Sequence, residues 1–153
     1  MTKISEVQEY YGKTLQQSSD LKTNACCTIK VYPDHIKEAM SLIHDEVHNH
    51  YYGCGLTIAT ELKGTKVLDL GSGAGRDCYI LSKLVGPEGE VIGVDMTKEQ
   101  LDIANNHLDF HTKAFGYTKP NTRFIEGDIA KLSECDLQDN YFDAIVSNCV
   151  INL

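Results

Sequence analysis

The sequence lacks an excess of positive charge. It contains 14 lysine and arginine residues against 22 aspartate and glutamate residues, which gives a formal net charge of -8 at pH 7. An acidic chain of this kind has no basic surface to attract phosphate backbones or anionic lipids. We therefore expect neither nucleic acid nor a membrane as a partner.

Long apolar runs are missing as well. Residues 1–11 (MTKISEVQEYY) carry charge in every turn and do not form the apolar core of a signal peptide, and no later stretch is long enough to span a bilayer. Without a secretion signal, the six cysteines belong in a reducing compartment, where thiols more often pack, bind metals or react than form a disulfide framework. We expect a soluble, cytoplasmic protein.

Internal repeats and low-complexity tracts are also absent from the sequence. The 153 residues, 42% of them hydrophobic, suffice for a domain with a real core. The pattern changes near Lys63 and Gly64, from polar and helical to alternating strand and helix. We predict an N-terminal helical and loop region over residues 1–62 and an α/β region over residues 63–153.

An amphipathic pattern opens the N-terminal region. Ser5 and Gln8 have the spacing of a capping box, which predicts that a short helix begins there. One side of this helix would carry Val7, Tyr11 and Leu15. The segment therefore predicts a first short helix.

A second helix is predicted to begin at Pro33. Its apolar positions have the spacing of a buried stripe and are Ile36, Met40, Ile43 and Val47. His44 and His48 on the same helix have the spacing of zinc ligands, but Asp45 stands where the zinc motif has glutamate. We interpret these histidines as solvent-facing, with a zinc site as the alternative.

The second half alternates strands with helices. Short apolar, β-branched segments predict strands over residues 66–70 (KVLDL), 91–94, 123–125 and 142–147. Helices are predicted over residues 76–84 and from a Thr97 and Gln100 capping box to Gly116, the latter with an apolar side made of Leu101, Ala104, Leu108 and Phe115. Strands that alternate with helices form a parallel sheet, so we predict an α/β, Rossmann-like fold.

A glycine-rich turn joins the first of these strands to the helix that follows. Gly71, Gly73 and Gly75 let the chain bend sharply and let a ligand approach the backbone. Because Arg76 stands where a dinucleotide fingerprint has its last glycine, a pyrophosphate is not the expected ligand. Asp95 ends the next strand, where a carboxylate can accept both hydrogen bonds of a ribose diol. Turn and acid favour an adenosine-containing ligand; an ordinary tight turn and a helix-entry aspartate are the alternatives.

The turn resembles the L-D-L-G-S-G-x-G motif of class I S-adenosylmethionine methyltransferases, here residues 68–75. Further segments are similar to the arsenite methyltransferase family, and they are residues 24–26 (NAC), 51–56 (YYGCGL), 75–78 (GRDC), 94–97 (VDMT) and 147–153 (SNCVINL). The second and the last of these are the most specific. The cysteine-bearing segments 24–27 and 51–55 are both predicted to be loops.

The resemblance implies S-adenosyl-L-methionine as the cofactor and a set of residues that bind it. The glycine turn would hold the methionine part, Asp128 would meet the adenine amino group, and Tyr52 would close over the cofactor. Asn148 is placed at the ligand crevice by its position at a strand end. The complete set of cofactor-binding candidates is Tyr52, Asp69, Gly71, Ser72, Gly73, Gly75, Asp95, Met96, Asp128, Ile129 and Asn148.

The resemblance also implies a substrate, trivalent arsenic bound by thiols. Arsenic(III) is soft and prefers sulfur ligands. By matching positions, Cys26 and Cys54 correspond to a disulfide-forming redox pair and Cys149 to one of two arsenic ligands. A thiol reductant such as glutathione or thioredoxin would then be a partner. Cys78 is interpreted as a packing residue, and Cys27 and Cys135 as ordinary free thiols.

The family's remaining arsenic ligand would lie beyond Leu153, and its three-layer α/β/α sheet has seven strands where four are predicted here. We therefore expect a C-terminally truncated chain of reduced activity, whose fourth strand presents an apolar edge at residues 144–146 and favours aggregation. Two alternatives stay open. One is a methyltransferase for another small acceptor, and the other is a non-catalytic module that binds the cofactor or arsenic.

Overall fold

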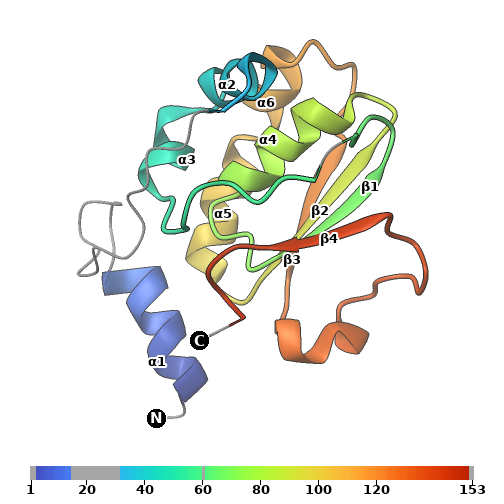
Figure 1. The fold of residues 1–153 in the computed structure, drawn as a ribbon. Helices are drawn as coiled ribbons and strands as arrows, with labels where there is room; N and C mark the ends of the chain where they lie inside the picture. The colour runs from blue at the N-terminus through green and yellow to red at the C-terminus, as the bar shows by residue number, and fades with distance from the viewer. Residues whose placement is uncertain (1–2, 15–31, 60, 152–153) are drawn as a thin grey trace.

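Figure 1 shows the computed structural model of the chain, which describes residues 3–14, 32–59 and 61–151. Its centre is a parallel sheet of four strands in the order β3-β2-β1-β4. The strands are β1 (Lys66–Leu70), β2 (Glu90–Asp95), β3 (Thr122–Glu126) and β4 (Ala144–Ser147). The predicted α/β fold with four parallel strands is confirmed.

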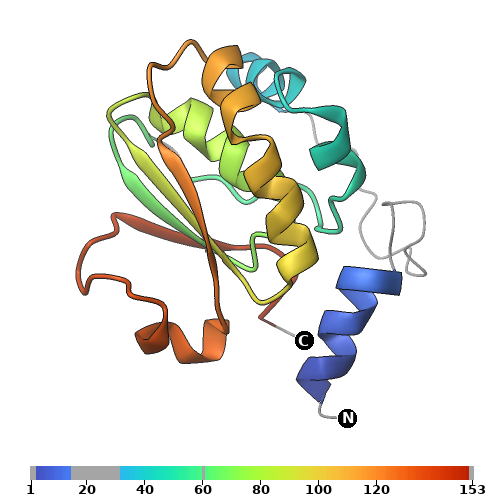
Figure 2. The same cartoon turned by 180° about the vertical axis from the view of Figure 1, so that it is seen from behind.

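Two layers of unequal thickness cover the sheet. Helices α4 (Arg76–Val85) and α5 (Lys98–Asn106) pack on one face of the sheet (Figures 1 and 2). The short 3-10 helix η3 (Ile129–Glu134) lies on the opposite face, over a cluster that includes Leu68, Ile92 and Val94. Because the central strands are covered on both sides, the buried positions of β1 and β2 are apolar or glycine, with Asp69 as the exception.

The fourth strand lies at one edge of the sheet, as predicted. β4 pairs with β1 alone among the described strands. Val146 packs inward and is 8% exposed, whereas Ile145 points outward and is 61% exposed. An apolar side chain thus sits beside unpaired backbone groups, the arrangement that favours edge-to-edge association.

The two long helices expected from the sequence are each broken in two. The first becomes α2 (Asp34–Ser41) and α3 (Asp45–Asn49), and the second becomes α5 and α6 (Leu108–Ala114). The breaks meet in space, because the backbone N–H of His44 donates to Nε2 of His111 at 3.2 Å. His44 also caps α3, its Nδ1 accepting from the Glu46 N–H. The predicted buried stripe is nevertheless confirmed, since Ile36, Ile43 and Val47 are buried and Met40, which is partly buried, packs against the same cluster.

The predicted capping boxes are wrong in detail. Helix α1 begins at Lys3, upstream of Ser5, and runs to Glu9, where a π-helical turn η1 (Tyr10–Thr14) follows. Thr97 does precede α5, but its side chain makes no capping bond. Both glutamines reach to other elements instead, because Gln8 donates to the carbonyl of Met96 and Gln100 to that of Tyr11. These two bonds dock α1 and η1 onto the strand-and-helix unit.

No helix among the described residues is long and apolar enough to cross a membrane. The predicted boundary between residues 62 and 63 stays a prediction. Leu15, Cys26 and Cys27 lie outside the described residues.

Candidate active site at the carboxyl ends of the strands

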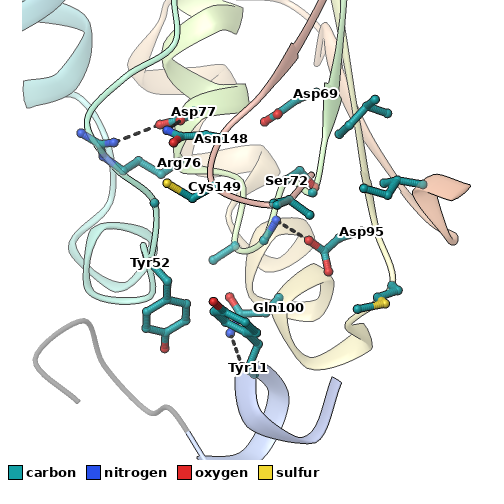
Figure 3. A pocket seen from close by; sticks show the side chains of 18 of the residues that line it. Tyr11, Tyr52, Asp69, Ser72, Arg76, Asp77, Asp95, Gln100, Asn148 and Cys149 are labelled. Atoms are coloured by element: carbon teal, nitrogen blue, oxygen red, sulfur yellow. Dashed lines mark hydrogen bonds and ion pairs between the residues drawn. The ribbon is translucent and has the colours of Figure 1, made fainter. Parts of the chain in front are cut away.

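A cavity of about 570 Å³ opens at the carboxyl ends of β1, β2 and β4. Its walls come from the glycine turn after β1, the start of α5, the segment after β3, the segment after β4 and the residues near Tyr52. Val7 of α1 and Tyr11 of η1 also line it. Figure 3 shows Tyr11 on the side away from the sheet. In open α/β sheets this crevice is where ligands bind.

The glycine turn is held tightly to the neighbouring strand. Gly71, Gly73 and Gly75 have φ values of 80°, 53° and 84°, in the left-handed region that favours glycine. The backbone N–H groups of Gly71 and Ser72 both donate to the carbonyl of Val94, at 2.8 and 3.1 Å. The turn is therefore a fixed cradle whose geometry is set before any ligand arrives.

Asp95 ties this cradle to the second strand. Its Oδ2 accepts from the backbone N–H of Gly73 and its Oδ1 from that of Thr97, both at 2.8 Å. Each carboxylate oxygen has a second lone-pair site, so both can still accept a ribose hydroxyl. The helix-entry role that was the alternative is thus present, and it leaves the ribose role possible because Asp95 also lines the cavity.

In the described part of the chain, two buried polar atoms of the cavity wall have no hydrogen-bond partner. They are Oγ of Ser72 and Oε1 of Gln100, in side chains that are 8% and 3% exposed. Leaving such groups unpaired costs about 1–3 kcal/mol each, so they fit a ligand that supplies the missing bonds. A methionine or ribose moiety carries suitable ammonium, carboxylate and hydroxyl groups. The wall therefore fits S-adenosylmethionine.

Asp69 lies beneath the cradle and is 3% exposed. Burial, followed by the nearby charge of Asp77, raises the pKa of Asp69 to about 7. The Cys78 thiol, fully buried, donates to Asp69 Oδ2 at 3.2 Å. Cys78 is thus confirmed as a packing residue, with the added task of partnering a buried acid.

Most of the remaining cofactor candidates line the cavity as expected. Met96, Asp128, Ile129, Asn148 and Tyr52 all do so. Asp128 also caps η3, its Oδ1 accepting from the Ala130 N–H at 2.9 Å, and its role as a cofactor contact stays a prediction. Gly75 is not part of the lining.

Gly75 instead faces the protein interior. A Cβ there would lie 2.6 Å from Phe124 and 3.1 Å from the Cβ of Ala104. Its glycine is required for close packing of α4, and its role as a cofactor contact stays a prediction.

The described cysteines fall into three environments. Cys149 is exposed, carries a free thiol and lines the cavity. Cys54 is disulfide-bonded and lies in the loop before β1, outside the cavity lining. Cys78 and Cys135 are buried free thiols. The cleft thus presents the thiol of Cys149, while the predicted pairing of Cys54 with Cys26 is untested because Cys26 is not among the described residues.

The wall also contains residues that sequence reasoning did not place there, among them Val7, Tyr11, Arg76, Asp77 and Gln100. Val7 and Tyr11 share a helix side in the sequence pattern, which was a usable signal of a buried face. The rings of Tyr11 and Tyr52 lie 5.8 Å apart at the rim (Figure 3). Gln100 was assigned to a helix cap, and this assignment hid its place in the wall.

A group of possible metal ligands lies outside the cleft. His44, Glu46 and His107 place one ligand atom each within 4.8 Å of one another, whereas His48 bonds to the carbonyl of Met40. Among the described residues His48 is thus not part of this group, and the interpretation of His44 and His48 as solvent-facing is wrong, because both are half-buried and hydrogen-bonded. The His107 and His44 rings stack at 3.9 Å and His107 Nε2 contacts Glu46 Oε2 at 2.6 Å. These contacts dock α3 against the junction of α5 and α6.

The parallel sheet, the glycine cradle after β1 and the acid after β2 define a Rossmann-like domain of the class I S-adenosylmethionine methyltransferase type. The chain belongs to the methyltransferase-domain family, which matches residues 61–153.

Curated relatives place the chain more narrowly. The arsenite methyltransferase of Aquipseudomonas alcaligenes is 56% identical over 96% of this chain, and that of Homo sapiens is 50% identical over 97%. The crystal structure of an arsenic(III) S-adenosylmethionine methyltransferase from Chlamydomonas reinhardtii is 44% identical over 80% of this chain, with a TM-score of 0.78. The predicted resemblance to arsenite methyltransferases is confirmed. The chain spans 42%, 40% and 41% of these three proteins.

Proposed function

We propose that this chain binds S-adenosylmethionine in the cleft and takes part in methyl transfer to thiol-bound arsenic(III). The observation that carries the proposal is the free, exposed thiol of Cys149 in the wall of the cavity that also contains the orphaned Ser72 and Gln100 atoms. A thiol that can bind arsenic(III) and a glycine turn that can hold the cofactor thus face the same cavity. The relatives named above, which are arsenite methyltransferases, support this assignment.

On the cofactor side of the cleft, side chains and backbone groups of this chain bind and orient S-adenosylmethionine. Asp95 accepts from the ribose hydroxyls, the Gly71–Gly73 turn receives the methionine part, and Ser72 and Gln100 complete their hydrogen bonds on it. Asp128 meets the adenine amino group, with Met96, Ile129 and Tyr52 packed around the rings. The cofactor, when bound, supplies an electrophilic methyl group on a positively charged sulfur.

On the substrate side, the Cys149 thiolate holds arsenic(III) with its lone pair directed at that methyl group. Arsenic held in this way could form the new As–C bond with its lone pair, and the electron pair of the broken S–C bond would remain on the sulfur of the cofactor. Arsenic supplies both electrons, so the transfer requires alignment and electron-rich ligands more than a proton-accepting base.

Cys26 and Cys54 would act as the redox pair of this site. Two thiols that become a disulfide release two electrons and two protons, which can return oxidised arsenic to the trivalent state. A thiol such as glutathione or thioredoxin, in the cytoplasm, would reduce the disulfide again. Support comes from Cys54 itself, which is disulfide-bonded and whose N–H donates to the residue before Cys149.

Thermal unfolding tests the proposal, because a ligand that binds only the folded state raises the midpoint. We expect S-adenosylmethionine to raise it and arsenite with a thiol to raise it further. The variant C149S should lose the arsenite shift and keep the cofactor shift. C135S is the matched control, since Cys135 is a buried free thiol outside the cavity lining, and it should keep both shifts.

Other results point to the alternatives. A cofactor shift with an arsenite response unaffected by C149S would favour a methyltransferase for another small acceptor. Shifts with both ligands but no methylated arsenic would identify a non-catalytic binding module. The absence of any cofactor shift would overturn the proposal.

A further inference from the structure

Asn148 directly precedes Cys149, and its side chain forms hydrogen bonds to other segments of the chain. Its Oδ1 accepts from the backbone N–H of Cys54 at 3.1 Å. Its Nδ2 donates to Asp77 Oδ2 at 2.9 Å and to the Tyr51 hydroxyl at 2.7 Å. The residue after β4 is thereby tied to the first turn of α4 and to the loop that carries Cys54.

The partners of Asn148 are themselves fixed. Arg76 Nη1 contacts the second carboxylate oxygen of Asp77 at 2.9 Å, and the Arg76 guanidinium lies 4.0 Å above the Tyr51 ring. The Tyr51 hydroxyl donates to the carbonyl of Gly55. We name the side chains of Tyr51, Arg76, Asp77 and Asn148 the Asn148 clamp. Figure 3 shows its Arg76, Asp77 and Asn148 beside Cys149, across the cavity from Asp95.

The Asn148 clamp adds little net stability to the fold. Arg76 and Asp77 are only 8% and 6% exposed. The free energy lost when two such charges leave water offsets most of their electrostatic attraction. Burial raises the pKa of Asp77, while the charge of Arg76 and the Asn148 hydrogen bond oppose that rise. An apolar cluster of the same volume would be as stable, so the polar network is better explained by the geometry it enforces.

That geometry is needed at Cys149. Its backbone has φ of 56°, in the left-handed region that is strained for a residue with a Cβ. Such a conformation persists only where the surroundings enforce it. The four hydrogen bonds of the preceding Asn148 side chain, to Cys54, Tyr51, Asp77 and, at 3.4 Å, the carbonyl of Gly55, are the restraint.

We propose that Asn148, anchored by Asp77, Arg76 and Tyr51, is a positioning residue that holds the Cys149 backbone in its left-handed turn and so directs its thiol into the cleft. The inference rests on the proposed function, because the thiol's direction matters for arsenic. It differs from the earlier expectation that Asn148 contacts the cofactor, since both ends of its amide are already bonded within the protein. Asn148 acts through Cys149.

Calorimetric titration separates these roles. In N148A we expect the arsenite dissociation constant to rise about tenfold, because a misdirected ligand loses alignment, while that of S-adenosylmethionine stays within about twofold. N148D keeps the acceptor for the Cys54 N–H but sets a second carboxylate against Asp77, and should weaken arsenite binding similarly. N105A is the matched control, since Asn105 is exposed on α5 and bonds only within its helix, to the carbonyl of Leu101.

Each contrary outcome is informative. A loss of cofactor affinity as large as the loss of arsenite affinity would make Asn148 a cofactor ligand and overturn the inference. Unchanged affinities for both, with only a lower melting temperature, would reduce the clamp to a structural tie.

A readout without arsenic keeps the inference separate from the proposed function. Iodoacetamide alkylates exposed thiols, and peptide mass spectrometry reports Cys149 apart from the buried Cys78 and Cys135. We expect Cys149 to react at least about threefold faster in N148A than in the parent chain and in N105A, as its turn is released. If the parent chain binds no arsenite but this acceleration is seen, the proposed function fails while the clamp stands. An unchanged rate overturns the clamp.

Discussion

The two sides of the cleft are built by different means. The cofactor side consists of strand ends and a glycine turn whose backbone groups bond to one another, with Val94 and Asp95 as the anchors. The thiol side consists of two loops held together by side chains, above all Asn148 and Asp77. The cofactor side should therefore tolerate many side-chain substitutions but few at its glycines. The thiol side should be sensitive to substitution of the side chains that hold it.

The largest effect expected from this comparison is on the fold. Gly75→Ala places a Cβ 2.6 Å from Phe124 at a residue with φ of 84°. Strain and overpacking together should lower the free energy of unfolding by about 2–4 kcal/mol. Gly73→Ala is the matched control, because its Cβ would meet only Gln100 Oε1, at 3.8 Å. Urea unfolding should show a clearly smaller loss for Gly73→Ala, and equal losses would contradict the packing argument.

The second prediction concerns the anchor of the cofactor side. Asp95→Ala removes the acceptor for the Gly73 and Thr97 N–H groups as well as the proposed ribose acceptor. We expect S-adenosylmethionine to bind about 2–3 kcal/mol less tightly, as for a lost charged hydrogen-bond partner. Calorimetric titration measures this, with Asp102→Ala as control, since Asp102 pairs with Lys98 on the surface of α5. An unaltered affinity would mean that Asp95 serves only the turn.

The third prediction is a pH dependence beneath the cradle. The pKa of Asp69 is about 7 in the folded state, above the ordinary value of 3.8. The folded state thus favours the protonated acid, so the stability it contributes is complete below pH 4 and is lost as pH rises through 7. Asp69→Asn keeps an acceptor for the Cys78 thiol but cannot ionise. At pH 8 it should be more stable than the parent by roughly 1–3 kcal/mol, and at pH 4 about equal.

The measurement is urea unfolding of both chains across this range. The difference between them isolates Asp69 from the other titrating groups. A difference that does not change with pH would show that Asp69 ionises as freely in the folded chain as in the unfolded one.

Local signals predicted the cofactor side well. β1 was predicted over the residues it occupies, because an apolar run there is bounded by charge and glycine, and the turn and Asp95 follow it directly. The helix breaks at His44 and His107 were missed, since their contacts are made between segments far apart in the chain: His44 bonds to His111, 67 residues away, and its ring stacks on that of His107. The Asn148 clamp was missed for the same reason. Its members have ordinary local roles and meet only in the folded chain.

The smallest effect tests a side-chain tie far from the cleft. His107→Gln removes the ring stacked on His44 and the contact with Glu46, a half-exposed carboxylate, so only about 0.5–1 kcal/mol of stability should be lost. The loss should fall on α3, whose amides would exchange hydrogen faster, while amides of β1 and β2 keep their protection. His35→Gln, on the exposed side of α2, is the control. Because α3 leads into the loop that carries Tyr51 and Cys54, an undocked α3 should also loosen the Asn148 clamp. A rise in Cys149 alkylation in His107→Gln, smaller than that in N148A, would show that the thiol side is held from this distance, and an unchanged rate would confine the restraint to the clamp itself.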